Sequence, residues 1–132
     1  GCRVVIVDDG VDNRRLFRAF IESAGACVRV VGDGSSALDL LLSPRRTPGG
    51  SEPVDLVLLD LNLPDQDGLT VLRALREGGF GCPVIGLTAH TSNELHAQCV
   101  REGFTACVSK PISRVGLIDI CAQAVQRRGV AA

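Results

Sequence analysis

The chain has 132 residues, a formal net charge of −1, no Trp or Tyr and only four Phe. This length suits one domain with its own hydrophobic core. The weak net charge draws the chain to neither nucleic acid nor anionic membranes, and the scarcity of aromatic residues leaves no platform for stacked bases. No apolar stretch approaches the roughly 18 residues of a membrane span, and the N-terminal apolar run is too short for a signal peptide.

The six cysteines are widely scattered, and no C-x-x-C pair suggests a zinc site. Three of them, Cys27, Cys107 and Cys121, lie inside apolar patterns, where cysteine behaves as a small hydrophobic residue. We therefore expect reduced core thiols in a cytoplasmic protein rather than a disulfide framework.

Strand and helix patterns alternate along the chain. Short runs rich in Val, Ile and Leu predict strands buried on both faces, as in a parallel sheet, at residues 3–8, 27–31, 55–60, 83–88 and 105–109. Segments of helical period predict helices at about 12–24, 35–42, 68–77, 93–102 and 113–127. Right-handed crossovers between parallel strands then give an α/β fold, a doubly wound five-stranded sheet with five helices.

Capping and turn residues mark several boundaries. Asp12 is the expected N-cap of the first helix and Gly25 its stop, while Ser35 or Ser36 opens the second helix. The stretch SPRRTPGGSEP, residues 43–53, is a loop by composition and is long for a helix-to-strand connection. Because strand and helix patterns resume after it, we expect a surface excursion within one domain.

Four predicted strands end on polar residues suited to phosphate or metal chemistry, namely Asp8-Asp9, Asp60, Thr88 and Lys110. Ligands of open parallel sheets bind beyond the carboxyl ends of the strands, so these side chains are expected to converge. Two carboxylates about 4 Å apart repel by roughly 4 kcal/mol at an effective dielectric constant near 20, so the group needs a cation or raised pKa values. A site of a few carboxylates suits Mg²⁺.

The same residues fit phosphoryl chemistry. A carboxylate such as Asp60 attacks phosphorus to form an acyl phosphate, with Mg²⁺ neutralising the incoming oxygens. Thr88 offers a hydroxyl donor and Lys110 a mobile positive charge. Each residue alone has an ordinary alternative: Asp8 or Asp9 as a helix cap, Thr88 as a strand terminator, Lys110 as a solvated charge.

In combination, these positions resemble a response-regulator receiver domain of two-component signalling. The matched residues are Asp8-Asp9, Asp60 within LVLLDLNLPDQDG, Thr88-Ala89 and Lys110-Pro111. The resemblance covers essentially the whole chain, and we assign the receiver domain to residues 1–129 and a tail to 130–132. It implies a flavodoxin-like sheet in the order 2-1-3-4-5. It also implies that Asp60 takes a phosphoryl group from a histidine kinase or a histidine phosphotransfer protein.

The resemblance further implies the ligands and the reaction class. Mg²⁺ would be held by Asp9, Asp60 and the backbone carbonyl of Asn62, with Asp8 acting through water. Thr88 and Lys110 would bind the phosphoryl oxygens, and the Lys110-Pro111 bond would be cis. Such a domain catalyses its own phosphorylation and slow dephosphorylation, and the full-length protein could itself be a histidine kinase.

Some positions depart from the family pattern. Cys107 lies three residues before the lysine, where the family usually has an aromatic residue that swings inward on activation. We therefore expect that phosphorylation either acts through Thr88 alone or gives a muted output, and that it reshapes residues 89–112 only modestly. His90 and Asn62 lie at positions that tune the lifetime of the phosphoryl group in this family, although an ordinary exposed side chain is the simpler role for His90.

The segment DGVDNRRL, residues 9–16, resembles receivers attached to hybrid sensor kinases, and we expect no DNA-binding module to follow. We expect a domain of a longer protein or a single-domain regulator that binds neither nucleic acid nor membrane. The last helix lacks a clear set of alternating charges, which argues against a salt-bridged dimer through that face and leaves the oligomeric state open, a monomer included.

Three alternatives carry different functions. A receiver fold could bind a partner without being phosphorylated, although the complete acidic set argues against this. An aspartate-nucleophile phosphatase needs its Asp pair at the first strand, whereas Asp60-Leu61-Asn62 follows the third. A nucleotide-binding domain needs a Gly-rich phosphate loop after the first strand, and residues 8–12 do not supply one.

Overall fold

The computed structural model describes residues 3–42, 54–65, 67–89, 93–110 and 112–131. The described part forms one parallel sheet of β1 (Arg3–Val7), β2 (Cys27–Val31), β3 (Leu56–Asp60), β4 (Val84–Thr88) and β5 (Ala106–Ser109). Its strand order is β2-β1-β3-β4-β5, which confirms the predicted doubly wound topology. The helices between the strands are α1 (Val11–Ser23), α2 (Gly34–Leu42), α3 (Gly68–Glu77), α4 (Asn93–Glu102) and α5 (Arg114–Ala131).

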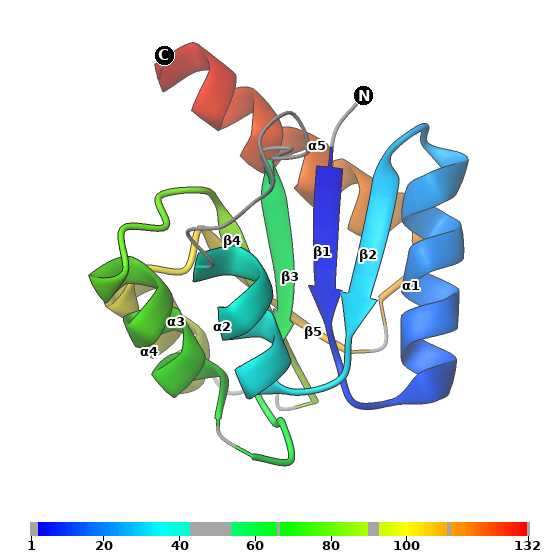
Figure 1. Cartoon of the computed structure of the whole chain (residues 1–132). Helices are drawn as coiled ribbons and strands as arrows, with labels where there is room; N and C mark the ends of the chain where they lie inside the picture. Colours follow the sequence, from blue (N-terminus) through cyan, green and yellow to red (C-terminus); the bar gives the residue numbers. More distant parts are fainter. Residues whose placement is uncertain (1–2, 43–53, 66, 90–92, 111, 132) are drawn as a thin grey trace, which may run out of the picture.

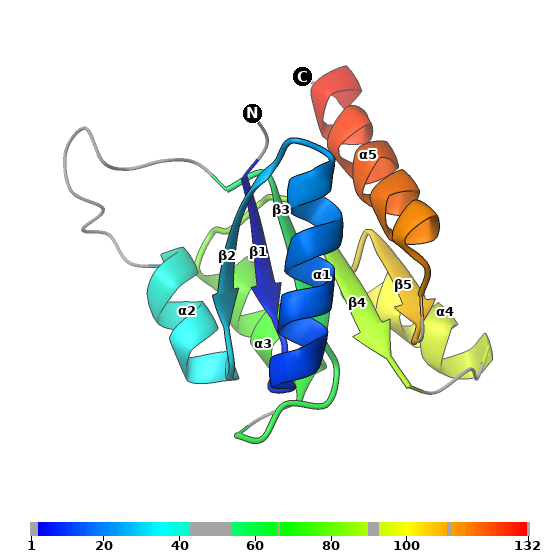
Figure 2. The same ribbon diagram turned by 90° about the vertical axis from the view of Figure 1, so that its right-hand side faces the viewer.

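The helices form two layers, one on each face of the sheet. Helices α1 and α5 cover one face, and α2, α3 and α4 cover the other (Figure 1). Figure 2 shows α2 on one side of the strands β2 and β1 and α1 and α5 on the other. Among the described residues, no helix combines the length and the apolar character needed to cross a membrane.

The central strands are apolar on both faces because both faces are covered. In β1, Val5 and Val7 pack into the hydrophobic cluster that includes α2, α3 and α4. Val4 and Ile6 point the other way, into the cluster that includes α1 and α5. This two-sided burial explains why the strand sequences lack the polar–apolar alternation of a half-exposed strand.

Strand register brings the polar strand ends to one edge of the sheet. Val7 pairs with Leu59 in the parallel β1–β3 ladder, so the residues that follow each of them, Asp8 and Asp60, come side by side. In the β3–β4 ladder Asp60 pairs with Leu87, which places Thr88 one step beyond. The predicted convergence at the carboxyl ends is therefore confirmed by the pairing of the strands.

The start of α1 differs from the prediction. The N-cap is Gly10, and Asp12 lies inside the first helical turn, so the assignment of Asp12 as N-cap is wrong. A carboxylate in the first turn still interacts favourably with the positive end of the helix dipole, which explains why an Asp is found so near the boundary. Gly25 follows the C-cap with a φ of +95°, and the predicted stop is confirmed.

The boundaries of α2 and α5 also differ. Helix α2 begins at Gly34, before both Ser35 and Ser36, so neither serine opens it. Asp33 takes the capping role, because its carboxylate accepts a hydrogen bond from the Ser36 N–H at 2.7 Å. Helix α5 continues to Ala131 rather than ending near residue 127.

Five cysteines lie in the described part, and all five are free thiols. Cys99 and Cys121 are buried and Cys107 is half-buried. Cys27 is exposed at the start of the edge strand β2, so its assignment to the core is wrong. The 43–53 excursion, His90 and Pro111, with the predicted cis bond, lie outside the described residues.

Candidate functional site

Three carboxylates form a cluster at the edge of the sheet where the strands end. Oxygens of Asp8, Asp9 and Asp60 all lie within 4.8 Å of one another. Asp8 and Asp60 are buried, with 0% and 4% of their surface exposed, whereas Asp9 is exposed. Oxygen ligands at this spacing, with one side open to solvent, suit a hard divalent cation that keeps some of its water. The residues present therefore fit Mg²⁺.

Lys110 joins the two buried carboxylates. Its ammonium nitrogen lies 2.9 Å from Oδ2 of Asp8 and 3.0 Å from Oδ2 of Asp60. Burial alone would lower the pKa of Lys110, but the hydrogen bonds to Asp8 and Asp60 and their charges outweigh burial, so its pKa is raised. The three carboxylates and the single ammonium leave two negative charges, which favours a divalent cation at the cluster.

Backbone contacts fix the orientation of Asp8 and the approach of Lys110. Oδ1 of Asp8 accepts a hydrogen bond from the Gly10 N–H at 2.8 Å, so both oxygens of this carboxylate have donors. Asp8 thus also contacts Gly10, the N-cap residue of α1. The Lys110 N–H donates to the Thr88 carbonyl at 2.7 Å, which holds the lysine at the end of β4.

The loop after β3 is folded tightly against Asp60. The Asn62 N–H donates to Oδ1 of Asp60 at 2.9 Å, and the Gly68 N–H donates to the Leu61 carbonyl at 2.9 Å. A β-bridge pairs Asn62 with Asp67. A Cβ at Gly68 would lie 2.7 Å from the Leu61 Cα, so this close approach requires glycine. The loop therefore presents the backbone of Asn62 beside the acidic cluster.

The structure brings the predicted site residues together. Asp8, Asp9, Asp60 and Lys110 form the cluster itself. Thr88 is fully buried at the end of the adjacent strand β4, and the Asn62 N–H contacts Asp60 directly. Their roles toward a metal and a phosphoryl group remain predictions.

One residue of this region, Asp65, could not be singled out from the sequence alone. Asp65, in the loop after β3, accepts hydrogen bonds from the Gly34 N–H at 2.9 Å and from the N–H and hydroxyl of Ser35, each at 3.0 Å. The Gly34 and Ser35 hydrogen bonds lower the pKa of this exposed carboxylate from 3.8 to about 2. Its partners lie about 30 positions away in the chain, and no local pattern signals such a contact.

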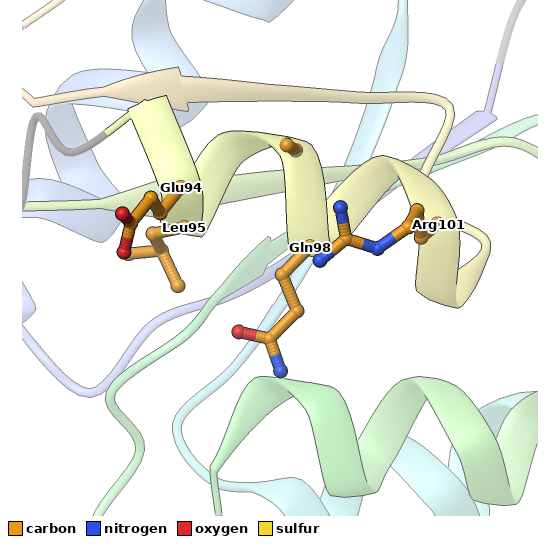
Figure 3. A pocket seen from close by; sticks show the side chains of 5 residues that line it. Glu94, Leu95, Gln98 and Arg101 are labelled. Carbon is orange, nitrogen blue, oxygen red and sulfur yellow. The ribbon is translucent and has the colours of Figure 1, made fainter.

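A separate hollow of about 510 Å³ lies along α4. Figure 3 shows its lining side chains, with Gln98 directed toward α3. The lining residues are Glu94, Leu95, Ala97, Gln98 and Arg101. None of them belongs to the acidic cluster, so this hollow is not the predicted phosphate site.

Comparison with known proteins agrees with the geometry. The family model described as "Response regulator receiver domain" matches residues 4–122. The sensor histidine kinase RcsC of Escherichia coli K12 is 34% identical over 110 residues, covering 83% of this chain and 11% of the kinase. The chain thus spans about a tenth of the length of such sensor kinases.

Shorter proteins match over most of their own length. An uncharacterized 14.6 kDa protein of Leptolyngbya boryana is 33% identical, with 91% of this chain and 87% of that protein covered. The receiver domain of a Francisella response regulator superposes with a TM-score of 0.86 at 26% identity, covering 97% of this chain and 99% of that one.

Domains of this family work with histidine kinases or phosphotransfer proteins, and they generally use Mg²⁺ at an acidic site. The match over most of the chain, the 2-1-3-4-5 sheet and the acidic cluster at its edge lead to one assignment. The chain belongs to the response-regulator receiver domains of two-component signalling and is homologous to the receiver domains of hybrid sensor kinases such as RcsC.

Proposed function

We propose that Asp60 is the residue of this receiver domain that accepts the phosphoryl group, from a phosphohistidine of a histidine kinase or a histidine phosphotransfer protein. The observation that carries the proposal is the contact of Lys110 with both Asp8 and Asp60, beside the exposed Asp9. This arrangement combines a nucleophile, a positive charge and further oxygen ligands at the accessible end of a parallel sheet.

The chemistry is an in-line displacement at phosphorus. A carboxylate oxygen of Asp60 forms the new O–P bond while the P–N bond to the donor imidazole breaks. The imidazole nitrogen leaves with the bonding electron pair and takes up a proton, and an acyl phosphate remains on Asp60. Lys110 already donates a hydrogen bond to Asp60 and is placed to donate to a phosphoryl oxygen instead. The Thr88 hydroxyl donates to a second phosphoryl oxygen.

Mg²⁺ is the proposed cofactor, held by Asp9, Asp60 and the Asn62 carbonyl, with Asp8 acting through water. When bound, it neutralises the phosphoryl oxygens and favours in-line geometry. Asp8 also orients the ammonium of Lys110, at 2.9 Å, so its effect on the reaction does not depend on direct metal contact.

The scattered cysteines, with no C-x-x-C pair, support a reducing compartment such as the cytoplasm.

Fluorine NMR with beryllofluoride tests this proposal, because beryllofluoride mimics a phosphoryl group on a carboxylate. With Mg²⁺ present, the wild-type domain should show bound-fluoride signals, and Asp60→Asn should show none. Asp39→Asn changes an exposed carboxylate of α2 and serves as the matched control that keeps the signals. A folded wild-type domain without bound signals, or an Asp60→Asn variant that keeps them, would contradict the proposal.

A further inference from the structure

The loop between β3 and α3, residues 61–67, carries the backbone of Asn62 next to Asp60. Its base is closed by the Gly68 N–H bond to the Leu61 carbonyl and by the bridge between Asn62 and Asp67. Asp67 also caps α3 by accepting a hydrogen bond from the Thr70 N–H at 2.8 Å. These contacts fix the two ends of the loop, and in its outer part, residues 63–65, Leu63 packs against the hydrophobic cluster.

Asp65 adds polar contacts to this outer part. Three hydrogen bonds, all between 2.9 and 3.0 Å, join its carboxylate to Gly34 and Ser35. These residues form the first turn of α2, where free N–H groups and the helix dipole favour a negative charge. The pKa of Asp65, about 2, keeps the carboxylate ionised and the contact intact at neutral pH.

Helix α2 is a firm anchor for this contact. Ala37 and Leu41 are buried in the cluster that also contains Val57 and Leu59 of β3. The hydrogen bonds of Asp65 therefore tie the outer part of the loop to an element already packed on β3. Through this route the loop is fixed at its base and at its outer part relative to Asp60.

We propose that Asp65 is a positioning residue that holds the loop after β3 in the geometry required for metal binding at Asp60 and Asn62. The inference rests on the proposed function, because it concerns the same Mg²⁺ site. It adds a residue that lies outside the acidic cluster and acts through α2. Preorganisation of this kind increases affinity because less ordering remains to be done on binding.

The chain offers a matched control for this role. Asp33 also accepts a hydrogen bond from the start of α2, from the Ser36 N–H at 2.7 Å, but it precedes the helix and this hydrogen bond stays within the start of α2. Asp33→Ala removes a cap of α2, while Asp65→Ala removes an interaction with α2 and the anchor of the loop. A purely structural contribution through α2 predicts similar effects for both variants.

The experiment measures Mg²⁺ affinity without any phosphorylation, by titrating Mg²⁺ into ¹⁵N-labelled protein and following the amide signals of Leu61 and Asn62. Asp65→Ala should raise the Kd for Mg²⁺ about three- to tenfold, below the 10–100-fold typical of a residue that orients a ligand directly. Asp33→Ala should leave the Kd within about twofold of wild type. Ser35→Ala, which keeps both backbone hydrogen bonds, should also stay near wild type.

The possible results distinguish a failure of the positioning role of Asp65 from a failure of the proposed function. If wild type binds Mg²⁺ and the Asp65→Ala and Asp33→Ala variants have the same Kd, the positioning role is wrong and the proposed function stands. If folded wild type binds no Mg²⁺, the metal site of the proposed function fails, and the positioning role fails with it. Urea unfolding of each variant confirms that the Kd values refer to folded protein.

Discussion

The ammonium of Lys110 lies 3.0 Å from Oδ2 of Asp60, although the two residues are 50 positions apart in the chain. The same ammonium reaches Asp8, so one positive charge separates two buried carboxylates. This contact links the end of β5 to the ends of β1 and β3. The ion pairs of Lys110 with Asp8 and Asp60 therefore hold the side chains of the site together.

Lys110→Met should lower the free energy of unfolding by about 3 kcal/mol, because it leaves two buried carboxylates facing each other without a cation. Excess Mg²⁺ should restore part of the loss by supplying positive charge. Urea unfolding at neutral pH, with and without Mg²⁺, measures both effects. Arg73→Met removes an exposed ion pair with Glu102 and serves as control, with an expected loss of stability well below that of Lys110→Met. Equal losses for the two variants would contradict the role of Lys110.

Gly68→Ala should destabilise the fold and weaken Mg²⁺ binding. Its added Cβ would lie 2.7 Å from the Leu61 Cα and 2.9 Å from the Asp60 carbonyl oxygen, and backbone atoms cannot yield as a flexible side chain can. We expect the free energy of unfolding to fall by about 2 kcal/mol. Gly81→Ala, where nothing lies within 4 Å of the added atom, should change stability by less than about 0.5 kcal/mol. Thermal unfolding of both variants distinguishes the positions, and similar melting temperatures would contradict the close packing at Gly68.

Asp65 should give the domain a stability dependence at acid pH. Its pKa is lowered from 3.8 to about 2, chiefly by the Gly34 and Ser35 hydrogen bonds, so the folded state favours the ionised form. The resulting stabilisation is fully present above pH 4 and is lost as the pH falls from about 4 toward 2. The difference in unfolding free energy between wild type and Asp65→Asn should shrink across that interval. A constant difference over the same interval would show that the ionised carboxylate is not what stabilises the contact.

Cys107 should react slowly with alkylating reagents. Burial, together with the neighbouring Cys99 thiol, raises its pKa to about 12, so almost none of it is thiolate near neutral pH. Iodoacetamide at pH 8, followed by peptide mass spectrometry, should modify exposed Cys27 at least about tenfold faster than Cys107. In denaturant the two rates should converge. Equal rates in the folded protein would mean that β5 opens readily at this position.

The fold could be predicted because its signals are local. Continuous apolar runs indicated strands buried on both faces, and the pairing of Val7 with Leu59 confirms the consequence that Asp8 and Asp60 meet. The candidate site followed from the same reasoning, since polar residues at strand ends must lie at the ligand-binding edge of a parallel sheet. Lys110 was expected to serve the phosphoryl group, and the structure shows that it also bridges carboxylates.

What the sequence did not reveal depends on contacts between distant segments or on competition between neighbouring residues. The N-cap of α1 is Gly10 and not Asp12, although both residues are compatible with a helix start. Cys27 is exposed because β2 lies at the edge of the sheet. The apolar residues next to Cys27 in the sequence do not indicate which strand lies at that edge. The contact of Asp65 with α2 joins segments about 30 residues apart and could be found only in three dimensions.

The most direct test of the central claim is the intact mass of the domain after incubation with acetyl phosphate and Mg²⁺. The account predicts that wild type gains the mass of one phosphoryl group and that Asp60→Asn gains none. Omission of Mg²⁺ should reduce the gain, because the acidic cluster would lack its cation. A folded wild-type domain that gains no phosphoryl group, or an Asp60→Asn variant that gains as much as wild type, would contradict the account.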